Sequence, residues 1–202
     1  MNYLAHLYFA EPTPESLVGN LLPDFTKNIH TQNYSETILT GVSLHRFIDQ
    51  YTDAHPIVQE SKKRISSHRR RFSGILVDIF YDHFLAIHWQ QYQSQTLLES
   101  TQFFYAQLSK VESELPPRLS EAIARMPEID LLYNYRTLKG IEHAVDRVSQ
   151  RIRFKNNLHG GIIELEENFD TLESDFHCFF SDLQKAVAVY KCPSSCSVSQ
   201  SL

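Results

Sequence analysis

The sequence has few cysteines and no long apolar run. Its 202 residues include three cysteines, Cys178, Cys192 and Cys196. An odd count predicts free thiols in a reducing compartment rather than a disulfide framework. No stretch approaches the about 20 apolar residues that a membrane span requires, and the N-terminus lacks the basic and apolar regions of a signal peptide. We therefore expect a cytoplasmic protein with no membrane span.

Several catalytic motifs are also missing. The sequence has no Walker-type glycine loop, no dinucleotide-binding fingerprint and no Gly-x-Ser-x-Gly elbow, so these three chemistries lack support. The net charge is −5 and the pI is about 6.0, which disfavours a general binder of nucleic acid. The oligomeric state is left open.

The residues that are present favour an all-helical fold. Apolar residues make up 42% of the chain, with 13 Phe and 10 Tyr, enough for a substantial core. Strand alternation, hairpin signals and internal repeats are not found. We predict a single-domain helical bundle over 1–190, and a Ser-rich, disordered tail over 191–202. In that tail Cys192 and Cys196 lack partner ligands, so we expect no metal site there.

Helix boundaries follow from caps and breakers. Thr13 with Pro14, Ser35, Ser73 and the Thr96–Glu99 capping box mark helix starts. A single apolar stripe from Ile162 to Val187 predicts one long final helix. The expected helices are 13–22, 35–52, 56–67, 73–89, 96–114, 118–125, 128–135, 137–149 and the final helix after 161.

Acidic and imidazole side chains interrupt two apolar stripes. One stripe consists of Ile38, Val42, His45, Asp49 and Thr52. The other consists of Ile75, Asp78, Asp82, Leu85 and Trp89, with His83 one step around. Residues three and four apart share a helix face, so these polar groups should point inward. Burying unpaired carboxylates costs several kcal/mol, so their charge must be compensated.

A divalent metal ion is the better explanation for the five polar groups together. For any one of them an ordinary buried pair, such as Asp49 with Arg46 or Asp82 with His45, would suffice. His6, four residues after Asn2, and Asp24 after Pro23 could complete the site, although a lone residue of either type is more often structural. Mixed histidine and aspartate ligands suit Mn²⁺, Fe²⁺, Zn²⁺ or Mg²⁺. Such a cluster points to hydrolysis of a phosphate ester.

A basic cluster follows the first stripe. Six cationic residues lie within ten positions: Lys62, Lys63, Arg64, Arg69, Arg70 and Arg71. Such a run is most often a solvated helix face and turn. Its functional interpretation is a docking surface for an acidic partner.

Five segments together resemble the acyl carrier protein phosphodiesterases, a divergent branch of the HD phosphohydrolases. They are MNYLAHL (1–7), GNLLPDF (19–25), HRFID (45–49), TDAHP (52–56) and DIFYDHFL (78–85). The resemblance is specific over about the first ninety residues and weaker as far as 151. The wider superfamily has an adjacent His-Asp pair, whereas this sequence has the reversed order, Asp82-His83.

The resemblance implies an HD-domain-like helical fold, a divalent metal with Mn²⁺ favoured, and removal of 4'-phosphopantetheine from holo acyl carrier protein. It implies that metal ligands or catalytic groups come from His6, Asp24, His45, Asp49, Asp78, Asp82 and His83. We expect a metal-bound hydroxide to attack phosphorus, with Asp49 or Asp82 orienting the water and Arg46 stabilising phosphate charge. His83 or His45 would protonate the leaving oxygen.

Carrier protein is small and acidic, so the Lys62–Arg71 cluster is its expected dock, with Arg147, Arg151, Arg153 and Lys155 as a second basic patch. Two alternatives remain open. One is a related hydrolase of a nucleotide or another small phosphoester. The other is a helical binding protein whose cluster is only a structural metal or ion-pair core.

Overall fold

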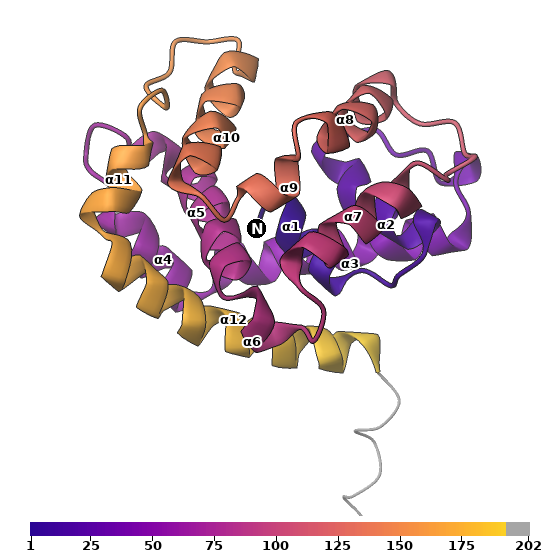
Figure 1. Cartoon of the computed structure of the whole chain (residues 1–202), viewed down its shortest axis with the longest axis horizontal. Helices are drawn as coiled ribbons and strands as arrows, with labels where there is room; N and C mark the ends of the chain where they lie inside the picture. Colours follow the sequence, from indigo (N-terminus) through magenta and orange to yellow (C-terminus); the bar gives the residue numbers. More distant parts are fainter. Residues whose placement is uncertain (193–202) are drawn as a thin grey trace, which may run out of the picture.

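The computed structural model describes residues 1–192, and all regular elements in this range are helices (Figure 1). The all-helical expectation is therefore confirmed for this part of the chain. The α-helices are α1 (Tyr3–Phe9), α2 (Pro14–Leu21), α3 (Glu36–Ala54), α4 (Pro56–Arg64), α5 (Ser73–Ile87), α6 (Trp89–Tyr92), α7 (Leu97–Leu108), α8 (Pro117–Glu128), α9 (Leu131–Asn134), α10 (Leu138–Arg151), α11 (Ile162–Glu167) and α12 (Phe169–Lys191). Three 3-10 turns lie at η1 (Leu22–Asp24), η2 (Thr31–Asn33) and η3 (Arg70–Phe72).

Most predicted helix starts are where the caps placed them. The side chains of Thr13 and Ser35 accept backbone N–H groups at the starts of α2 and α3. Thr96 and Glu99 form the complete capping box of α7. Ser73 differs, because it is the first residue of α5 and its side chain makes no cap hydrogen bond there.

The predicted final helix is two helices. Asn168 separates α11 from α12, and its side-chain amide donates to the Glu164 carbonyl at 3.0 Å. A local side-chain hydrogen bond of this kind competes with continuation of the helix. The apolar spacing continues through Asn168, so the spacing alone did not indicate this break. The 96–114 helix is also shorter than predicted, because α7 ends at Leu108.

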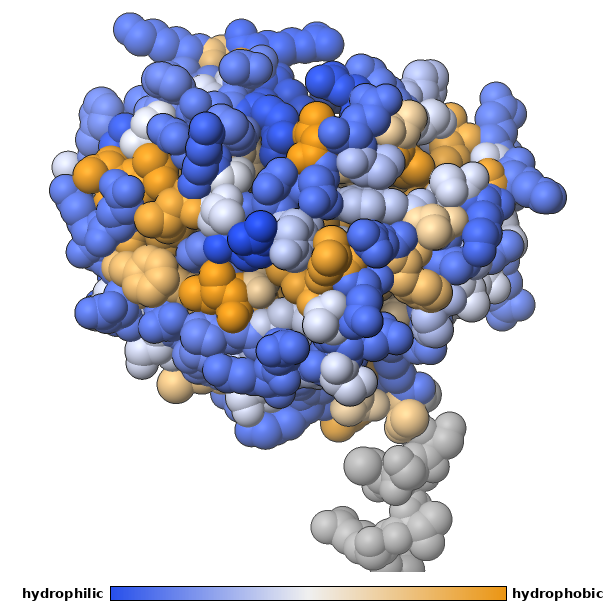
Figure 2. Space-filling model, in the orientation of Figure 1, coloured by the Kyte–Doolittle hydropathy of each residue, from blue (hydrophilic) through white to orange (hydrophobic). Residues whose placement is uncertain are grey.

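The helices surround one hydrophobic core. Figure 1 shows α4, α5, α10 and α11 on the left, α2, α7 and α8 on the right, and α12 running beneath them. Helix α1 lies in the middle and packs on both α2 and α5. Its residues Leu4, Ala5 and His6 are completely buried. The view in Figure 2 shows a mostly hydrophilic surface with scattered apolar patches.

Two glycines allow α2 and α3 to approach closely. A Cβ atom on Gly41 would lie 2.8 Å from the Ser16 carbonyl oxygen and 2.9 Å from Cα of Gly19. A Cβ atom on Gly19 would in turn collide with the Ile38 carbonyl oxygen, so both positions require glycine. The close approach brings the C-terminal turn of α2 against the middle of α3, where His45 lies.

None of the helices within residues 1–192 is both long and apolar enough to cross a membrane. The predicted tail begins slightly too early, because Lys191 is the last residue of α12 and its ammonium donates to the Phe9 carbonyl at 2.7 Å. The rest of the tail prediction, including Cys196, concerns residues 193–202, which lie outside the described part.

Candidate metal centre

His45 is held by the chain in one orientation. Its Nδ1 atom donates to the Asn20 carbonyl oxygen at 2.7 Å, so a neutral ring presents the Nε2 lone pair on its other side. That Nε2 atom lies 3.0 Å from Oδ2 of Asp49 and 3.9 Å from Oδ1 of Asp24. A lone pair facing two carboxylates is stable only with a proton or a cation between them.

His6 supplies a second imidazole to the same place. Its ring stacks on that of His45 with centroids 3.8 Å apart, and its Nε2 lies 3.2 Å from Oδ1 of Asp49. Neither ring nitrogen of His6 makes a hydrogen bond of acceptable geometry, although the side chain is fully buried. Burial lowers the pKa of His6 to about 3, which keeps the ring neutral and able to bind a metal.

The carboxylates complete a set of donors that fits a divalent ion. One atom from each of His6, His45 and Asp49 lies within 4.8 Å of the other two. Burial by itself would raise the pKa of Asp49, but the adjacent His45 and His6 rings and the Met1 ammonium group hold it below its ordinary value. Neighbouring ligand atoms about 2.1 Å from one metal ion lie about 3 Å apart, close to the observed His45–Asp49 separation. The donor set thus fits the predicted metal.

The centre is open to solvent on its acidic side. The side chains of Asp49 and Asp24 are 42% and 34% exposed, whereas those of His6 and His45 are 0% and 3% exposed. Desolvation at its position raises the pKa of Asp24 to about 6. Asp24 can therefore gain or lose a proton near neutral pH, and water can reach it.

The Met1 ammonium group lies between two of the acids. It donates to Oδ1 of Asp78 at 3.1 Å and lies 3.6 Å from Oδ1 of Asp49. The ammonium group compensates part of the negative charge of Asp78 and Asp49. Helical periodicity could not predict this contact.

Asp82 anchors helix α1. Its two carboxylate oxygens accept the backbone N–H groups of Leu4 and Ala5 at 2.7 and 3.2 Å. These are donors of the first turn of α1, which have no partner inside the helix. Burial raises the pKa of Asp82 to about 7, although both hydrogen bonds oppose this. Asp82 thus fixes the helix on which His6 lies.

His83 and Arg46 do not join the cluster. The Nδ1 atom of His83 donates to the Tyr135 carbonyl at 2.7 Å, and its ring packs against Phe84 and Phe169. Arg46 is exposed, and its side chain makes no ion pair and no hydrogen bond with any other residue in 1–192. Thus five predicted residues converge, namely His6, Asp24, His45, Asp49 and Asp78.

Most of the Lys62–Arg71 cluster is engaged inside the chain. Three of its members form ion pairs with residues of other helices: Lys62 with Asp53, Arg64 with Asp175 and Arg69 with Glu164. Arg70 donates to the Ile65 carbonyl, Arg71 lies over Phe154, and Lys63 pairs with the exposed Glu60. Arg70 and Arg71 are therefore the members without a partner carboxylate, and Lys63 is an exposed lysine whose partner is exposed too. Asp53, the partner of Lys62, is also exposed, but Lys62 itself is largely buried.

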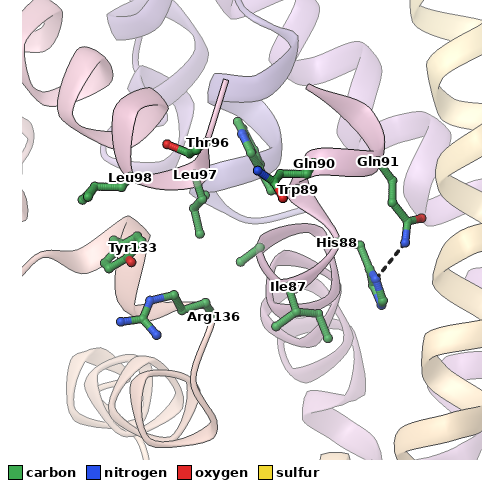
Figure 3. A pocket seen from close by; sticks show the side chains of 11 residues that line it. Ile87, His88, Trp89, Gln90, Gln91, Thr96, Leu97, Leu98, Tyr133 and Arg136 are labelled. Atoms are coloured by element: carbon green, nitrogen blue, oxygen red, sulfur yellow. Dashed lines mark hydrogen bonds between the residues drawn. The ribbon is translucent and has the colours of Figure 1, made fainter. Parts of the chain in front are cut away.

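A second histidine cluster lies at the end of α5. His88, Glu173 and His177 could also offer metal-ligand atoms. Hydrogen bonds already join them, with His88 Nε2 2.7 Å from Glu173 and His177 Nδ1 2.8 Å from the Tyr92 hydroxyl. His88 Nδ1 lies 3.1 Å from the Gln91 amide, drawn as a dashed line in Figure 3. These hydrogen bonds account for the cluster.

A cavity of about 540 Å³ adjoins this second cluster, lined by Ile87, His88, Trp89, Leu97, Tyr133, Arg136 and their neighbours (Figure 3). The Arg136 guanidinium lies over the Tyr133 ring at 4.1 Å. None of the five convergent residues lines this cavity.

Sequence reasoning missed Asn20 and Tyr135. Asn20 is completely buried in α2 and orients His45 through its backbone carbonyl. The Tyr135 hydroxyl accepts from the Asn2 side chain at 3.3 Å. Asn20 offered no signal in the sequence, because any residue at this position has the backbone carbonyl that orients His45. Tyr135 gave none, because its contact with Asn2 joins segments 133 positions apart.

Comparisons with known proteins agree with the resemblance seen in the sequence. A family model described as acyl carrier protein phosphodiesterase matches residues 1–183. The chain is 33% identical over 181 residues to the acyl carrier protein phosphodiesterase of Enterobacter sp. (strain 638), covering 89% of this chain and 94% of that protein. It is 32% identical over 186 residues to that of Serratia proteamaculans (strain 568), covering 92% and 96%. No solved structure matches the chain. The chain belongs to the acyl carrier protein phosphodiesterase family.

Proposed function

We propose that the protein is a metal-dependent phosphodiesterase that removes 4'-phosphopantetheine from holo acyl carrier protein and leaves the apo form. Family membership supports the substrate and reaction. The observation that supports metal dependence is the buried, neutral His6, whose ring nitrogens make no hydrogen bond although Nε2 faces Asp49. A second imidazole and a second carboxylate lie against the same point.

The proposed metal ligands are His6, His45, Asp49 and Asp24, with Asp78 at the edge of the group. Mn²⁺ is the favoured ion, and Fe²⁺, Zn²⁺ and Mg²⁺ suit the same nitrogen and oxygen donors. When bound, the ion supplies Lewis acidity that lowers the pKa of a coordinated water and polarises the phosphate.

The chain's own groups have separate roles in this proposal. The Asn20 carbonyl holds His45 with Nε2 directed inward, and Asp82 holds α1 so that His6 reaches the same point. Asp49 remains ionised and orients water. Asp24 lies on the solvent-exposed side of the group as a further ligand, and the leaving serine oxygen takes up its proton from solvent water on that side. The catalytic roles predicted for Arg46 and His83 lack this support, since neither contacts the cluster.

The test is intact-mass spectrometry of holo acyl carrier protein incubated with the protein and Mn²⁺. The proposal expects conversion to the apo mass and release of 4'-phosphopantetheine. A parallel panel of nucleotides and small phosphoesters should show little phosphate release. Turnover of the panel with no change in the carrier protein would favour the alternative hydrolase. A protein inactive on both, in which Asp49→Ala only lowers the melting temperature, would indicate a structural core.

Docking of the carrier protein is proposed to use Lys63, Arg70 and Arg71, the members of the basic cluster without a strong partner. Contacts of exposed charges mainly raise the association rate and weaken with salt. Reversing Lys63 and Arg71 to Glu should raise KM for holo acyl carrier protein at low salt without changing kcat. An unchanged KM would remove the cluster from the docking surface.

A further inference from the structure

A pocket with an arginine-rich wall opens beside the metal centre. Helices α8 and α10 stand on either side of α9 at the upper edge of Figure 1. Together with Tyr3, Asp24 and Phe25, residues of α8, α10, the start of α9 and the turn before it enclose a cavity of about 540 Å³. That volume lies within the 300–1,000 Å³ typical of small-molecule sites. The cavity therefore has the size of a ligand site and shares Asp24 with the centre.

Four arginines line this pocket, and they are poorly compensated. Arg118, Arg125, Arg147 and Arg151 belong to its wall. Within residues 1–192, only Arg125 has a carboxylate within 4.0 Å, namely Glu121 at 3.7 Å, and both side chains of that pair are more than 60% exposed. Arg147 is half-buried, so its charge is partly removed from water without a carboxylate partner. Uncompensated guanidinium groups around a cavity favour an anionic ligand.

Contacts link these arginines to the metal centre. Arg151 Nη1 donates to the Tyr3 hydroxyl at 3.3 Å, and the Tyr3 ring stacks on Phe25 with centroids 5.8 Å apart. Tyr3 is the first residue of α1, the helix of His6. Asp24 lines the pocket and lies 3.9 Å from His45 Nε2. An anion held by the arginines would therefore lie next to the acidic, open side of the centre.

We propose that this pocket binds the 4'-phosphopantetheine group of the substrate, with Arg147 and Arg151 contacting its phosphate. This inference rests on the proposed function and assigns the phosphate to α10 rather than to Arg46. The rest of the wall suits the arm, because Phe25, Met126 and Leu131 are apolar while Gln150 and the outer arginines can donate to amide carbonyls. A concave pocket fits a thin, extended group better than a folded protein surface.

The test measures binding without turnover. Calorimetry would follow 4'-phosphopantetheine, with inorganic phosphate as a second probe, binding to the chelator-treated protein so that no metal contributes. Arg147→Gln and Arg151→Gln should each weaken 4'-phosphopantetheine binding about tenfold or more, the effect of one hydrogen bond to a charged group. Arg136→Gln is the matched control, because Arg136 is an exposed arginine outside this pocket.

Turnover gives the second measurement. Both pocket variants should raise KM for holo acyl carrier protein, whereas Arg136→Gln should not. If Arg147→Gln fails to fold, the Arg151→Gln variant decides the outcome, because Arg151 is exposed. Pocket variants that bind 4'-phosphopantetheine as tightly as the wild type overturn the proposal. The proposal is also overturned if the pocket variants lose affinity only for the whole carrier protein, because the arginines would then contact its acidic surface.

Failure of the pocket and failure of the proposed function give different results. A wild-type protein that binds 4'-phosphopantetheine through Arg147 and Arg151 but never converts holo acyl carrier protein refutes the activity and leaves the pocket. A protein that converts the substrate equally well with and without these arginines refutes the pocket and leaves the activity.

Discussion

Nε2 of His45 lies 3.0 Å from Oδ2 of Asp49, one turn further along α3, while Nδ1 of the same ring donates to the Asn20 carbonyl. The histidine is thus oriented by the backbone of a different helix. A partner on the second nitrogen fixes the tautomer of a metal-binding imidazole and is part of such sites. Packing of α2 on α3 therefore orients His45 within the proposed cation site.

Asp49→Asn should remove most of the metal affinity. The amide is neutral and cannot replace the carboxylate that both histidines face. Loss of an outer partner of a ligand already costs about 10–100-fold in affinity, so we expect a larger loss here, measured by calorimetric titration with Mn²⁺. The control is Asp53→Asn, four residues further along α3, where Asp53 is exposed and pairs with Lys62. Equal affinities for the two variants would exclude Asp49 as a ligand.

Gly41→Ala should destabilise the fold and disturb the site. The new Cβ would lie 2.8 Å from the Ser16 carbonyl, so α2 would have to move away from α3 and the Asn20 carbonyl from His45. Overpacking of this kind costs about 1–3 kcal/mol of unfolding free energy, readable by urea denaturation.

Gly74→Ala is the matched control. At Gly74 a Cβ would meet only the Lys62 side chain at 3.6 Å. Alanine in a helix is favoured over glycine by about 1 kcal/mol, so this variant should keep or gain stability. Two glycine variants of equal stability would contradict the packing argument.

Asp82→Ala should act first on stability. It leaves the N–H groups of Leu4 and Ala5 buried without acceptors, which costs about 1–3 kcal/mol for an unsatisfied group. Asp82→Asn keeps one acceptor oxygen and should lose less. Both should also weaken Mn²⁺ binding, because α1 holds His6. Full stability of Asp82→Ala, combined with lost metal affinity, would indicate instead that Asp82 is a direct ligand.

Glu164 should make stability depend on pH. Burial acts to raise its pKa, but hydrogen bonds from Ser66 and Arg69 lower it below the ordinary 4.5. A lowered folded-state pKa contributes stability above the unfolded value, and that contribution disappears as the pH falls through the folded value. The advantage of the wild type over Glu164→Gln should therefore be largest near neutral pH and shrink below about pH 4.5. Denaturation midpoints between pH 3 and 7 would measure it.

Glu142→Gln is the control for this experiment, because Glu142 is exposed and makes no ion pair among residues 1–192. A constant difference between wild type and Glu164→Gln across the pH range would show that the contact is not electrostatic. The contribution of the Arg69–Glu164 contact to stability would then come from packing.

The sequence predicted most of the helices and the inward direction of the polar stripe on α3, because helical period and caps are local properties. It could not separate Asp82 from the proposed metal ligands. Both types of residue point inward, and only the tertiary position of α1 shows that Asp82 accepts its N–H groups. The same limit applies to Asn20, which acts through a backbone carbonyl. Ion pairs such as Arg64–Asp175 join residues 111 positions apart, so charge clustering alone overstated the free basic surface.

The most direct test of the account is metal-dependent conversion of holo acyl carrier protein, followed by intact mass after chelator treatment and stepwise return of Mn²⁺. Wild-type protein should lose conversion when stripped and regain it as Mn²⁺ binds, while Asp49→Asn should regain little at any concentration. Two results would contradict a metal held by His6, His45 and Asp49. One is conversion that continues at full rate in chelator, and the other is an Asp49→Asn variant that regains conversion with Mn²⁺ as the wild type does.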